Sequence, residues 1–271
     1  MTDIVKVWPN QPPAWNEPTE PEGDLTKPDG REVAGKPVIR LGNVAVPELH
    51  LFPAEGSDST VIVCPGGGFS ILAWDLEGIE IARWLQSHGV SAAVLKYRVP
   101  SRDHEPGWLP PVQDLQRSVS LIRGNAIPSL RSKHVGVLGF SAGGHTATRA
   151  AFGLVRHYVP VDKFDETSCE VDFAALIYTA YLTTARDSET LRNDLTVSEL
   201  TPPIFFAHAF DDPYTCMGAV QLFAEMKRKN VPSSLHVFSA GGHGFGGRES
   251  GEENDLWLPL FKSFLVDNKF A

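Results

Sequence analysis

The chain has 271 residues, of which 42% are hydrophobic and 21% are charged. This balance is typical of a globular protein with a sizeable buried core, and it fits a single large α/β domain. The formal net charge at pH 7 is -9, and acidic and basic residues are interleaved along the chain. This charge pattern disfavours nucleic acid and anionic membranes as partners.

The first residues, MTDIVKVWPN, lack the basic and then apolar pattern of a signal peptide, and no later stretch has the length of a membrane span. We therefore expect a soluble, cytoplasmic chain, with the reservation that a leader removed upstream would leave no trace in it. Cys64, Cys169 and Cys216 are an odd number without metal-ligand spacing, which argues against a disulfide framework and a zinc site. Cys64 ends an apolar run and is interpreted as a small buried hydrophobic residue.

Two parts of the chain differ in pattern. Residues 1–36 are rich in Pro, Glu, Asp and Gly without periodicity and predict an irregular N-terminal arm. Residues 37–271 alternate short apolar runs with amphipathic stretches, which predicts one α/β domain with a mostly parallel central sheet flanked by helices. Strands are predicted at 61–64, 92–95, 135–138, 174–178, 204–207 and 235–238, and helices at 80–87, 114–123, 147–152, 220–229 and 256–265.

The predicted strand at 135–138 runs directly into the pentapeptide GFSAG at 139–143. A serine hydroxyl is a weak nucleophile, so acyl-transfer enzymes place it on a sharp turn between a strand and a helix, beside an imidazole base. The following helix points its positive N-terminal end at developing negative charge. The motif in this context therefore predicts Ser141 as a nucleophile.

A glycine-rich loop, PGGGF at 65–69, follows the predicted strand at 61–64. Glycines allow backbone N–H groups to approach a ligand closely. Gly67 and Gly68, together with Ala142, are predicted to form an oxyanion hole, in which each donor lowers the barrier by about 3 kcal/mol. A structural turn and a phosphate-binding loop are the alternatives; the Lys-Ser/Thr ending of a P-loop and the Rossmann glycine spacing are both absent.

Two further segments supply the other groups that an activated serine needs. HAFDD at 208–212 follows the predicted strand at 204–207, and either Asp211 or Asp212 is placed to orient an imidazole. GGHGF at 241–245 follows the predicted strand at 235–238 and presents His243 as the base. The order Ser, Asp, His along the chain is that of α/β-hydrolases and differs from that of chymotrypsin and subtilisin.

These motifs together resemble the bacterial esterase/lipase group of α/β-hydrolases, which includes acetyl esterases and acetylxylan esterases. The likeness covers most of the chain and also runs through 51–53, 77–78, 82–85, 94–98, Asp114 with Arg117, and 144–145. In related hydrolases with a His-Gly-x-x-Asp strand end, the acid lies four positions beyond that histidine, which favours Asp212; Asp211 would then cap the loop. The resemblance implies a serine carboxylesterase that cleaves short acyl esters, commonly acetyl esters of sugars such as xylan fragments, without a cofactor.

The chain departs from the family pattern at two places. Pro65 stands where the lipase-type His-Gly-Gly-Gly motif has His, as in the acetyl-esterase-like group, and residues 214–216 replace the usual Val-Pro after the acid. The second departure leaves the alignment of Asp211 against Asp212 open.

Several neighbouring residues have two interpretations each. Trp74 and Glu77-Gly78 would either line an acyl pocket or pack a helix start on the sheet. Lys96, Tyr97 and Arg98 would either contact a sugar or hold structural salt bridges, and the structural role is favoured.

The stretch between the predicted strands at 174–178 and 204–207 is too short for a large cap domain, which predicts an open cleft and a small-molecule or oligosaccharide ester as substrate. A prolyl-oligopeptidase-like peptidase has the same core and triad order, and a non-catalytic receptor on a hydrolase scaffold is the alternative from another class. The sequence leaves the oligomeric state open.

Overall fold

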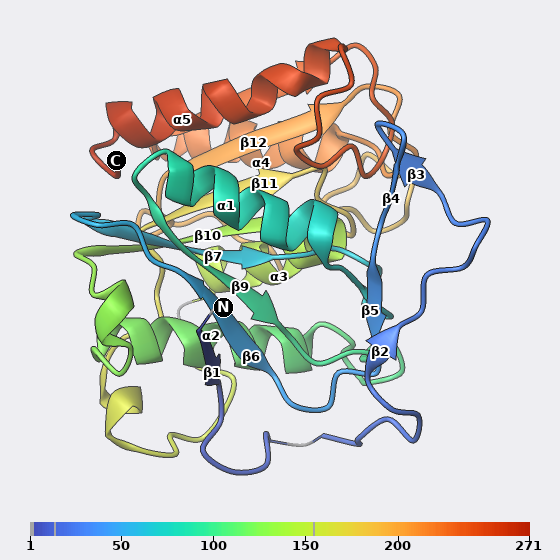
Figure 1. Cartoon of the computed structure of the whole chain (residues 1–271). Helices are drawn as coiled ribbons and strands as arrows, with labels where there is room; N and C mark the ends of the chain where they lie inside the picture. Colours follow the sequence, from blue (N-terminus) through green and yellow to red (C-terminus); the bar gives the residue numbers. More distant parts are fainter. Residues whose placement is uncertain (1–2, 14, 154) are drawn as a thin grey trace.

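The computed structural model describes residues 3–13, 15–153 and 155–271 (Figure 1). Its strands are β1 Ile4–Lys6, β2 Gly23–Asp24, β3 Glu32–Val33, β4 Lys36–Pro37, β5 Arg40–Gly42, β6 Glu48–Phe52, β7 Ser59–Cys64, β8 Leu72–Ala73, β9 Ser91–Lys96, β10 His134–Phe140, β11 Phe173–Ile177, β12 Ile204–Ala209 and β13 Ser233–Phe238. Its helices are α1 Glu80–Ser87, α2 Leu109–Arg123, α3 Ser141–Phe152, α4 Met217–Arg228 and α5 Trp257–Asp267, with short η1 Asp75–Ile79, η2 Pro128–Leu130, η3 Lys163–Glu166 and η4 Glu253–Leu256.

The centre of the molecule is an eight-stranded sheet in the order β1-β6-β9-β7-β10-β11-β12-β13. The six strands from β9 to β13 run parallel to one another, and β6 and β1 join one edge in antiparallel pairing. The parallel part is the mostly parallel sheet that the sequence predicts. The carboxyl ends of its strands lie at one edge, where α/β proteins build their sites.

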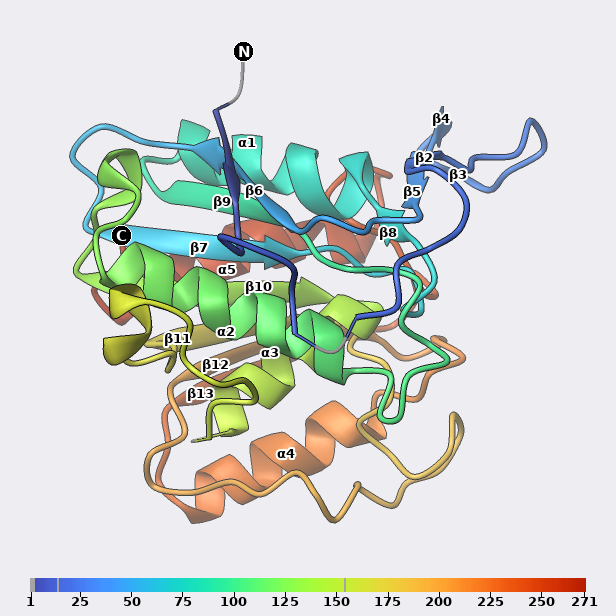
Figure 2. The same cartoon turned by 90° about the horizontal axis from the view of Figure 1, so that it is seen from below.

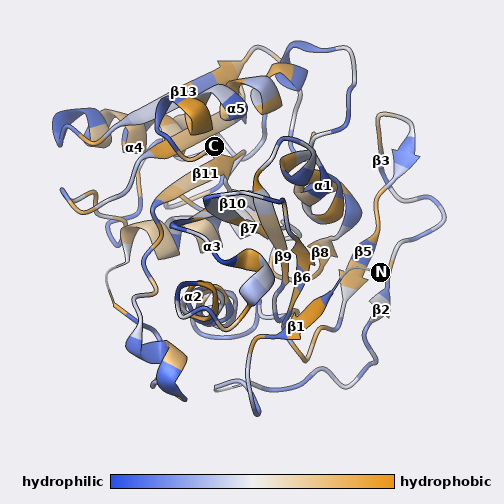
Figure 3. Ribbon diagram, turned by 60° about the vertical axis from the view of Figure 1, so that its left-hand side comes forward, coloured by the Kyte–Doolittle hydropathy of each residue, from blue (hydrophilic) through white to orange (hydrophobic). Residues whose placement is uncertain are grey.

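Helices cover both faces of this sheet. Figure 2 shows α1 and α5 on one face and α2, α3 and α4 on the other. Strand β7 is buried on both faces because its side chains alternate between two core clusters: Val61 and Val63 face the cluster that contains α1 and α5, and Ile62 and Cys64 face the other. Figure 3 shows the hydrophobic residues concentrated in these central strands.

The predicted helix at 80–87 is α1, whose buried residues Ile81, Ala82 and Leu85 recur at helical spacing on one face. The other predicted elements are present with longer or shifted boundaries. The largest shift is in α3, which begins at Ser141 itself and not at residue 147. Strand β6 was missing from the predicted elements; it carries the alternating burial of a strand that packs on one side.

The segment before residue 37 lies against the core and contributes short strands. Strand β1 pairs with β6 at the edge of the central sheet, β2 pairs with β5, and β3 forms a small ladder with β4. The part of the chain from β2 to β5 lies along the right of Figure 1. This placement brings N-terminal residues to the site described below.

Arg98 and Asp114, both fully buried, form an ion pair with Arg98 Nε 3.0 Å from Asp114 Oδ1. The Asp114 carboxylate also accepts hydrogen bonds from Trp8 Nε1 and from the backbone N–H of Arg98. Because these partners are buried, the cluster joins the segments that follow β1 and β9 to α2 rather than facing a ligand.

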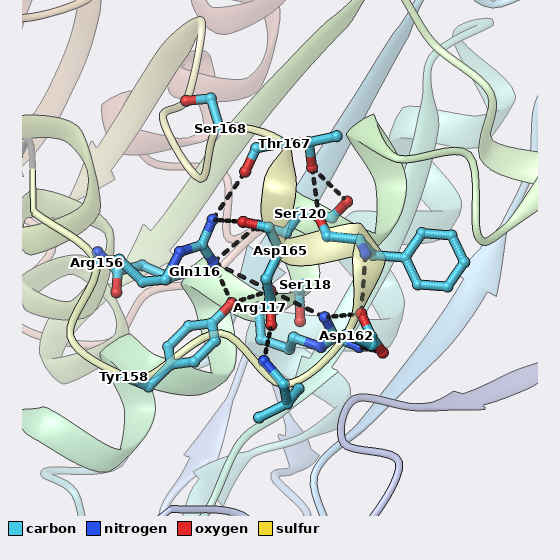
Figure 4. A network of polar contacts seen from close by, with 12 residues as sticks. Gln116, Arg117, Ser118, Ser120, Arg156, Tyr158, Asp162, Asp165, Thr167 and Ser168 are labelled. Atoms are coloured by element: carbon cyan, nitrogen blue, oxygen red, sulfur yellow. Dashed lines mark hydrogen bonds and ion pairs between the residues drawn. The ribbon is translucent and has the colours of Figure 1, made fainter.

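A second polar network fastens the segment 156–168 onto α2 (Figure 4). Arg117 reaches from α2 to Asp162 and Asp165, and Arg156 donates to Asp165 from the other side. The pairing of Arg117 with two carboxylates raises the pKa of the guanidinium even though burial acts in the opposite direction. The partners of Arg117 are other side chains of the fold, so the network is structural.

Candidate active site

Ser141 lies at the junction of β10 and α3, with a positive φ of 51°. Such a conformation is strained for a residue other than glycine and is common at functional turns. The flanking glycines allow the turn: a Cβ on Gly139 would lie 2.3 Å from the carbonyl oxygen of Gly143, and one on Gly143 would lie 2.2 Å from that of Cys64. The glycine spacing in GFSAG is therefore required by the close contacts of the turn.

The structure brings Ser141, His243 and Asp212 into one hydrogen-bonded chain. His243 Nε2 lies 2.7 Å from Ser141 Oγ, and His243 Nδ1 lies 2.7 Å from Asp212 Oδ2. The three residues follow the carboxyl ends of β10, β12 and β13. His243 is 31 positions after Asp212 and 102 positions after Ser141 in the sequence. In this arrangement the imidazole can remove the proton of the serine hydroxyl, and the carboxylate orients the imidazole.

The carboxylate of Asp212 is buried and held in place by several donors. Its Oδ1 accepts a hydrogen bond of 2.7 Å from the backbone N–H of Tyr214, and its Oδ2 lies 3.2 Å from His208 Nε2. Burial raises the pKa of Asp212, but the hydrogen bonds from His208 and His243 outweigh it and lower this pKa to about 2. Asp212 is therefore ionised when it faces His243.

Asp211 has a different position, although it is adjacent in sequence. Its side chain is exposed, and its Oδ1 accepts a hydrogen bond of 2.8 Å from the backbone N–H of Gly242. This contact fixes the loop that carries His243 without reaching the imidazole. The geometry thus separates the two neighbouring carboxylates, with Asp212 on the imidazole and Asp211 on the loop.

The loop at 65–69 passes directly beside Ser141. A Cβ on Gly66 would lie 2.9 Å from the Ser141 Cβ, and Gly67 and Gly68 have positive φ values of 137° and 62°. No described residue accepts a hydrogen bond from the backbone N–H of Gly67 or Gly68. Ala142 is the second residue of α3, so its N–H also lies in the unsatisfied first turn of a helix.

A buried glutamate connects this loop to the loop of His243. Glu77 Oε2 accepts a hydrogen bond of 2.6 Å from the Gly66 N–H, and Glu77 Oε1 accepts one of 2.9 Å from the Tyr178 hydroxyl. The same Tyr178 oxygen accepts a hydrogen bond from the Gly246 N–H. Burial raises the pKa of Glu77, while its hydrogen bonds and His243 oppose that rise.

A cavity of about 240 Å³ opens above Ser141 and His243. Gly67 and Gly68 form one wall, and Tyr181 and Tyr214 form another. Tyr214 packs against the His243 ring, with centroids 4.7 Å apart, and meets Tyr181 edge to face. A second cavity of about 180 Å³ adjoins it on the far side of the two tyrosines.

The structure gives the contacts of the residues near the site that the sequence leaves with two interpretations. Lys96 pairs with Glu22 and Glu48, and the Tyr97 hydroxyl donates to the carbonyl of Pro65. Arg98 belongs to the buried pair with Asp114, so all three have structural contacts. Trp74 packs on the ring of His50 and is absent from the lining of the cavity, whereas Glu77 forms part of it.

The sequence analysis does not predict that Arg31, Arg40 and His208 contact the site. Arg31, in the N-terminal segment without a periodic pattern, and Arg40, in β5, line the cavity. His208 was interpreted only as the end of a strand, yet it contacts Asp212. The spacing of four between His208 and Asp212 was the available signal for this contact.

The sheet order, the strained serine turn and the assembled Ser-His-Asp chain define the protein as an α/β hydrolase in fold. Solved structures agree with this class. The acetyl ester-xyloside bifunctional hydrolase from Caldicellulosiruptor lactoaceticus superposes with a TM-score of 0.76 at 25% identity, over 100% of this chain and 97% of that one. MGS-M1, an α/β hydrolase from a deep-sea metagenome library, superposes with a TM-score of 0.62 at 22% identity, over 82% and 91% of the two chains.

Among curated proteins, the chain is similar to an acetylxylan esterase from Xylanibacter ruminicola. The two are 29% identical over 235 residues, which cover 79% of this chain and 47% of the relative. The chain therefore spans about half the length of that relative. No protein-family model matches the chain. None of the helices in the described part of the chain is long and apolar enough to cross a membrane.

Proposed function

We propose that the protein is a serine esterase that hydrolyses short acyl esters, chiefly acetyl esters. The observation that carries this proposal is the unbroken chain from Ser141 Oγ through His243 to Asp212, with 2.7 Å at each step. The named activities of the two relatives that act on acetyl esters support the same reaction.

The mechanism follows from the positions of these groups. Ser141 Oγ attacks the ester carbonyl while His243 Nε2 takes its proton, and the Asp212 carboxylate holds the imidazole in the required tautomer. The N–H groups of Gly67, Gly68 and Ala142 then stabilise the negative charge on the carbonyl oxygen. His243 returns its proton to the departing alcohol, and water hydrolyses the acyl-enzyme by the same steps.

Different observations support the proposed acyl portion and the proposed alcohol portion of the substrate. A cavity of about 240 Å³ shared between them favours a short acyl group. Tyr181 and Tyr214 give the cavity an aromatic wall, which is suited to contact with a sugar. Together with the xylan-related names of the relatives, this supports acetylated carbohydrates, such as xylan fragments, as the substrate class.

Hydrolysis of p-nitrophenyl esters from acetate to laurate tests the proposal, with Ser141→Ala beside the wild type. Ser263→Ala is the matched control, because it removes an exposed hydroxyl from α5 that is not part of the cavity lining. We expect a rate that peaks at acetate, is unchanged in Ser263→Ala and is lost in Ser141→Ala. Labelling of Ser141 by a fluorophosphonate probe should accompany the activity. Turnover retained in Ser141→Ala, or no turnover of any ester by the wild type, would refute the assignment.

A further inference from the structure

The arginines of the chain fall into two groups. Eight of the 14 form ion pairs with carboxylates, as Arg98 does with Asp114. The other six have no carboxylate within 4.0 Å among the residues that the structure describes. They are Arg31, Arg40, Arg83, Arg102, Arg131 and Arg186.

Two of these six line the cavity of Ser141, and two more contact residues of its walls. Arg31 and Arg40 line the same cavity as Ser141 and His243. Arg102 donates two hydrogen bonds, of 2.9 and 3.2 Å, to the carbonyl of Gly68. Arg186 lies over the ring of Tyr214, with its guanidinium carbon 4.4 Å from the centroid. Arginines without a direct ion pair among the described residues are thus gathered near the site of a chain whose net charge is -9.

Arg40 provides the most specific observation. Its Nη1 atom is buried and has no hydrogen-bond acceptor among the described residues. That atom lies against the turn at Gly30, where a Cβ would come within 3.0 Å of it. The rest of the half-buried Arg40 side chain lines the cavity, where an anionic group of a substrate meets no competing carboxylate within 4.0 Å of the guanidinium among the described residues.

The carboxylates that border the site do not neutralise this charge. Asp212 is buried, and His208, His243 and the Tyr214 N–H occupy its oxygens. Glu77 is also buried, and Gly66 and Tyr178 donate to its oxygens. Arg31 interacts electrostatically with Glu77, and Arg40 with Asp24, but no carboxylate oxygen of the described residues lies within 4.0 Å of either guanidinium. No carboxylate therefore occupies their N–H donors.

We infer that the site takes esters whose alcohol portion carries an oxyanionic group, a carboxylate or a phosphate, which Arg40 and its neighbours bind. The inference rests on the proposed function, because an acetyl group has no place for a charge and the anion must then lie on the alcohol. Guanidinium groups match both oxyanions through paired N–H donors. Acetylated sugars with a uronate or a phosphate meet this description.

Three substrates test the inference: methyl glucoside, methyl glucuronoside and methyl glucoside 6-phosphate, each acetylated at the same hydroxyl. They differ only at the sixth carbon, so a ratio of kcat/KM values isolates the charge. We expect at least one anionic ester to exceed the neutral ester by about tenfold at low salt, mainly through KM. The ratio should fall toward one in 1 M NaCl, where the screening length is about 3 Å. The two anionic substrates distinguish carboxylate from phosphate.

Substitutions of single arginines test whether Arg40 causes the difference in kcat/KM between anionic and neutral esters. Arg40→Met keeps the length of the side chain and removes its charge, and it should bring the ratio close to one; Arg40→Lys should retain part of it. Arg131→Met is the matched control, because Arg131 is also unpaired but precedes β10 at the opposite edge of the sheet from Ser141. It should leave the ratio unchanged.

Two outcomes would overturn the inference. One is a wild-type ratio of one or less for both anionic esters, and the other is a ratio that is unaffected in Arg40→Met. In either case hydrolysis of the neutral ester would leave the proposed esterase activity intact. Failure to hydrolyse any of the three esters, together with p-nitrophenyl acetate, would instead refute the proposed function itself.

Discussion

Arg31 donates a hydrogen bond to the main-chain carbonyl of His243, 2.5 Å away and 212 positions later in the sequence. The exposed N-terminal segment therefore holds the loop that carries the proposed base. We expect Arg31→Ala to lower kcat for neutral p-nitrophenyl acetate on the order of tenfold, because the imidazole is less firmly positioned. Arg31→Lys should recover part of the loss, and Arg131→Ala should have no effect. Wild-type kcat in Arg31→Ala would show that the contact is dispensable for positioning.

Asp211 and Asp212 should differ sharply when each is replaced by asparagine. Asp212→Asn removes the charge beside His243 and favours the wrong tautomer, so we expect kcat to fall by about 10,000-fold. Asp211→Asn keeps an oxygen that accepts from the Gly242 N–H and should retain most of the activity. Steady-state kinetics of both variants on p-nitrophenyl acetate decides the matter. The reverse ranking would assign the acid to Asp211.

Gly67→Ala should disable the proposed oxyanion loop. A Cβ at this position would lie 1.9 Å from the main-chain oxygen of Ile71, and the residue has a φ of 137°. The loop must then shift, and we expect kcat to fall by about 100-fold or more. Gly89→Ala is the control, since it also has a positive φ but meets nothing within 4 Å. Equal kcat losses in the two variants would indicate backbone strain as the cause, and an unaffected kcat in Gly67→Ala would exclude this loop from the reaction.

Glu77 should make the stability of the fold depend on pH. Burial raises the pKa of this carboxyl above its ordinary value of 4.5, so the folded chain binds the proton more tightly than the unfolded chain does. The stabilisation is complete below 4.5 and is lost as pH rises through the raised pKa. We expect the Tm of the wild type to decrease relative to that of Glu77→Gln over this interval. Parallel Tm curves for the two proteins would contradict a raised pKa.

Replacement of one member of the buried ion pair between Arg98 and Asp114 should destabilise the fold strongly. Asp114→Asn leaves the Arg98 guanidinium buried without a counterion, and we expect the free energy of unfolding to fall by about 3–5 kcal/mol. Asp58→Asn breaks the exposed pair with Lys133 and should change it by less than about 1 kcal/mol. Urea denaturation measures both differences, and similar values for the two variants would argue against this ranking.

The sequence by itself determined the parallel core and the local motifs of the site. Apolar runs mark strands such as β7 because both faces of these strands are buried, and the glycines of GFSAG mark the serine turn because any side chain there would collide with backbone. The motifs and their order along the chain also identified Ser141, His243 and the adjacent pair Asp211 and Asp212 as candidate residues. Each of these signals is short-range, so it is readable without knowledge of the fold.

Only the tertiary structure decided what lies beside these motifs. The distinction between Asp211 and Asp212 depends on which side chain turns toward His243, and two adjacent residues carry no periodicity that reveals it. Arg40 reaches the site because β5 pairs with β8, and Arg31 reaches it through its contact with the carbonyl of His243. Hydrophobic burial fixes the core from local patterns, whereas the charges around the site depend on contacts between residues that are far apart in the chain.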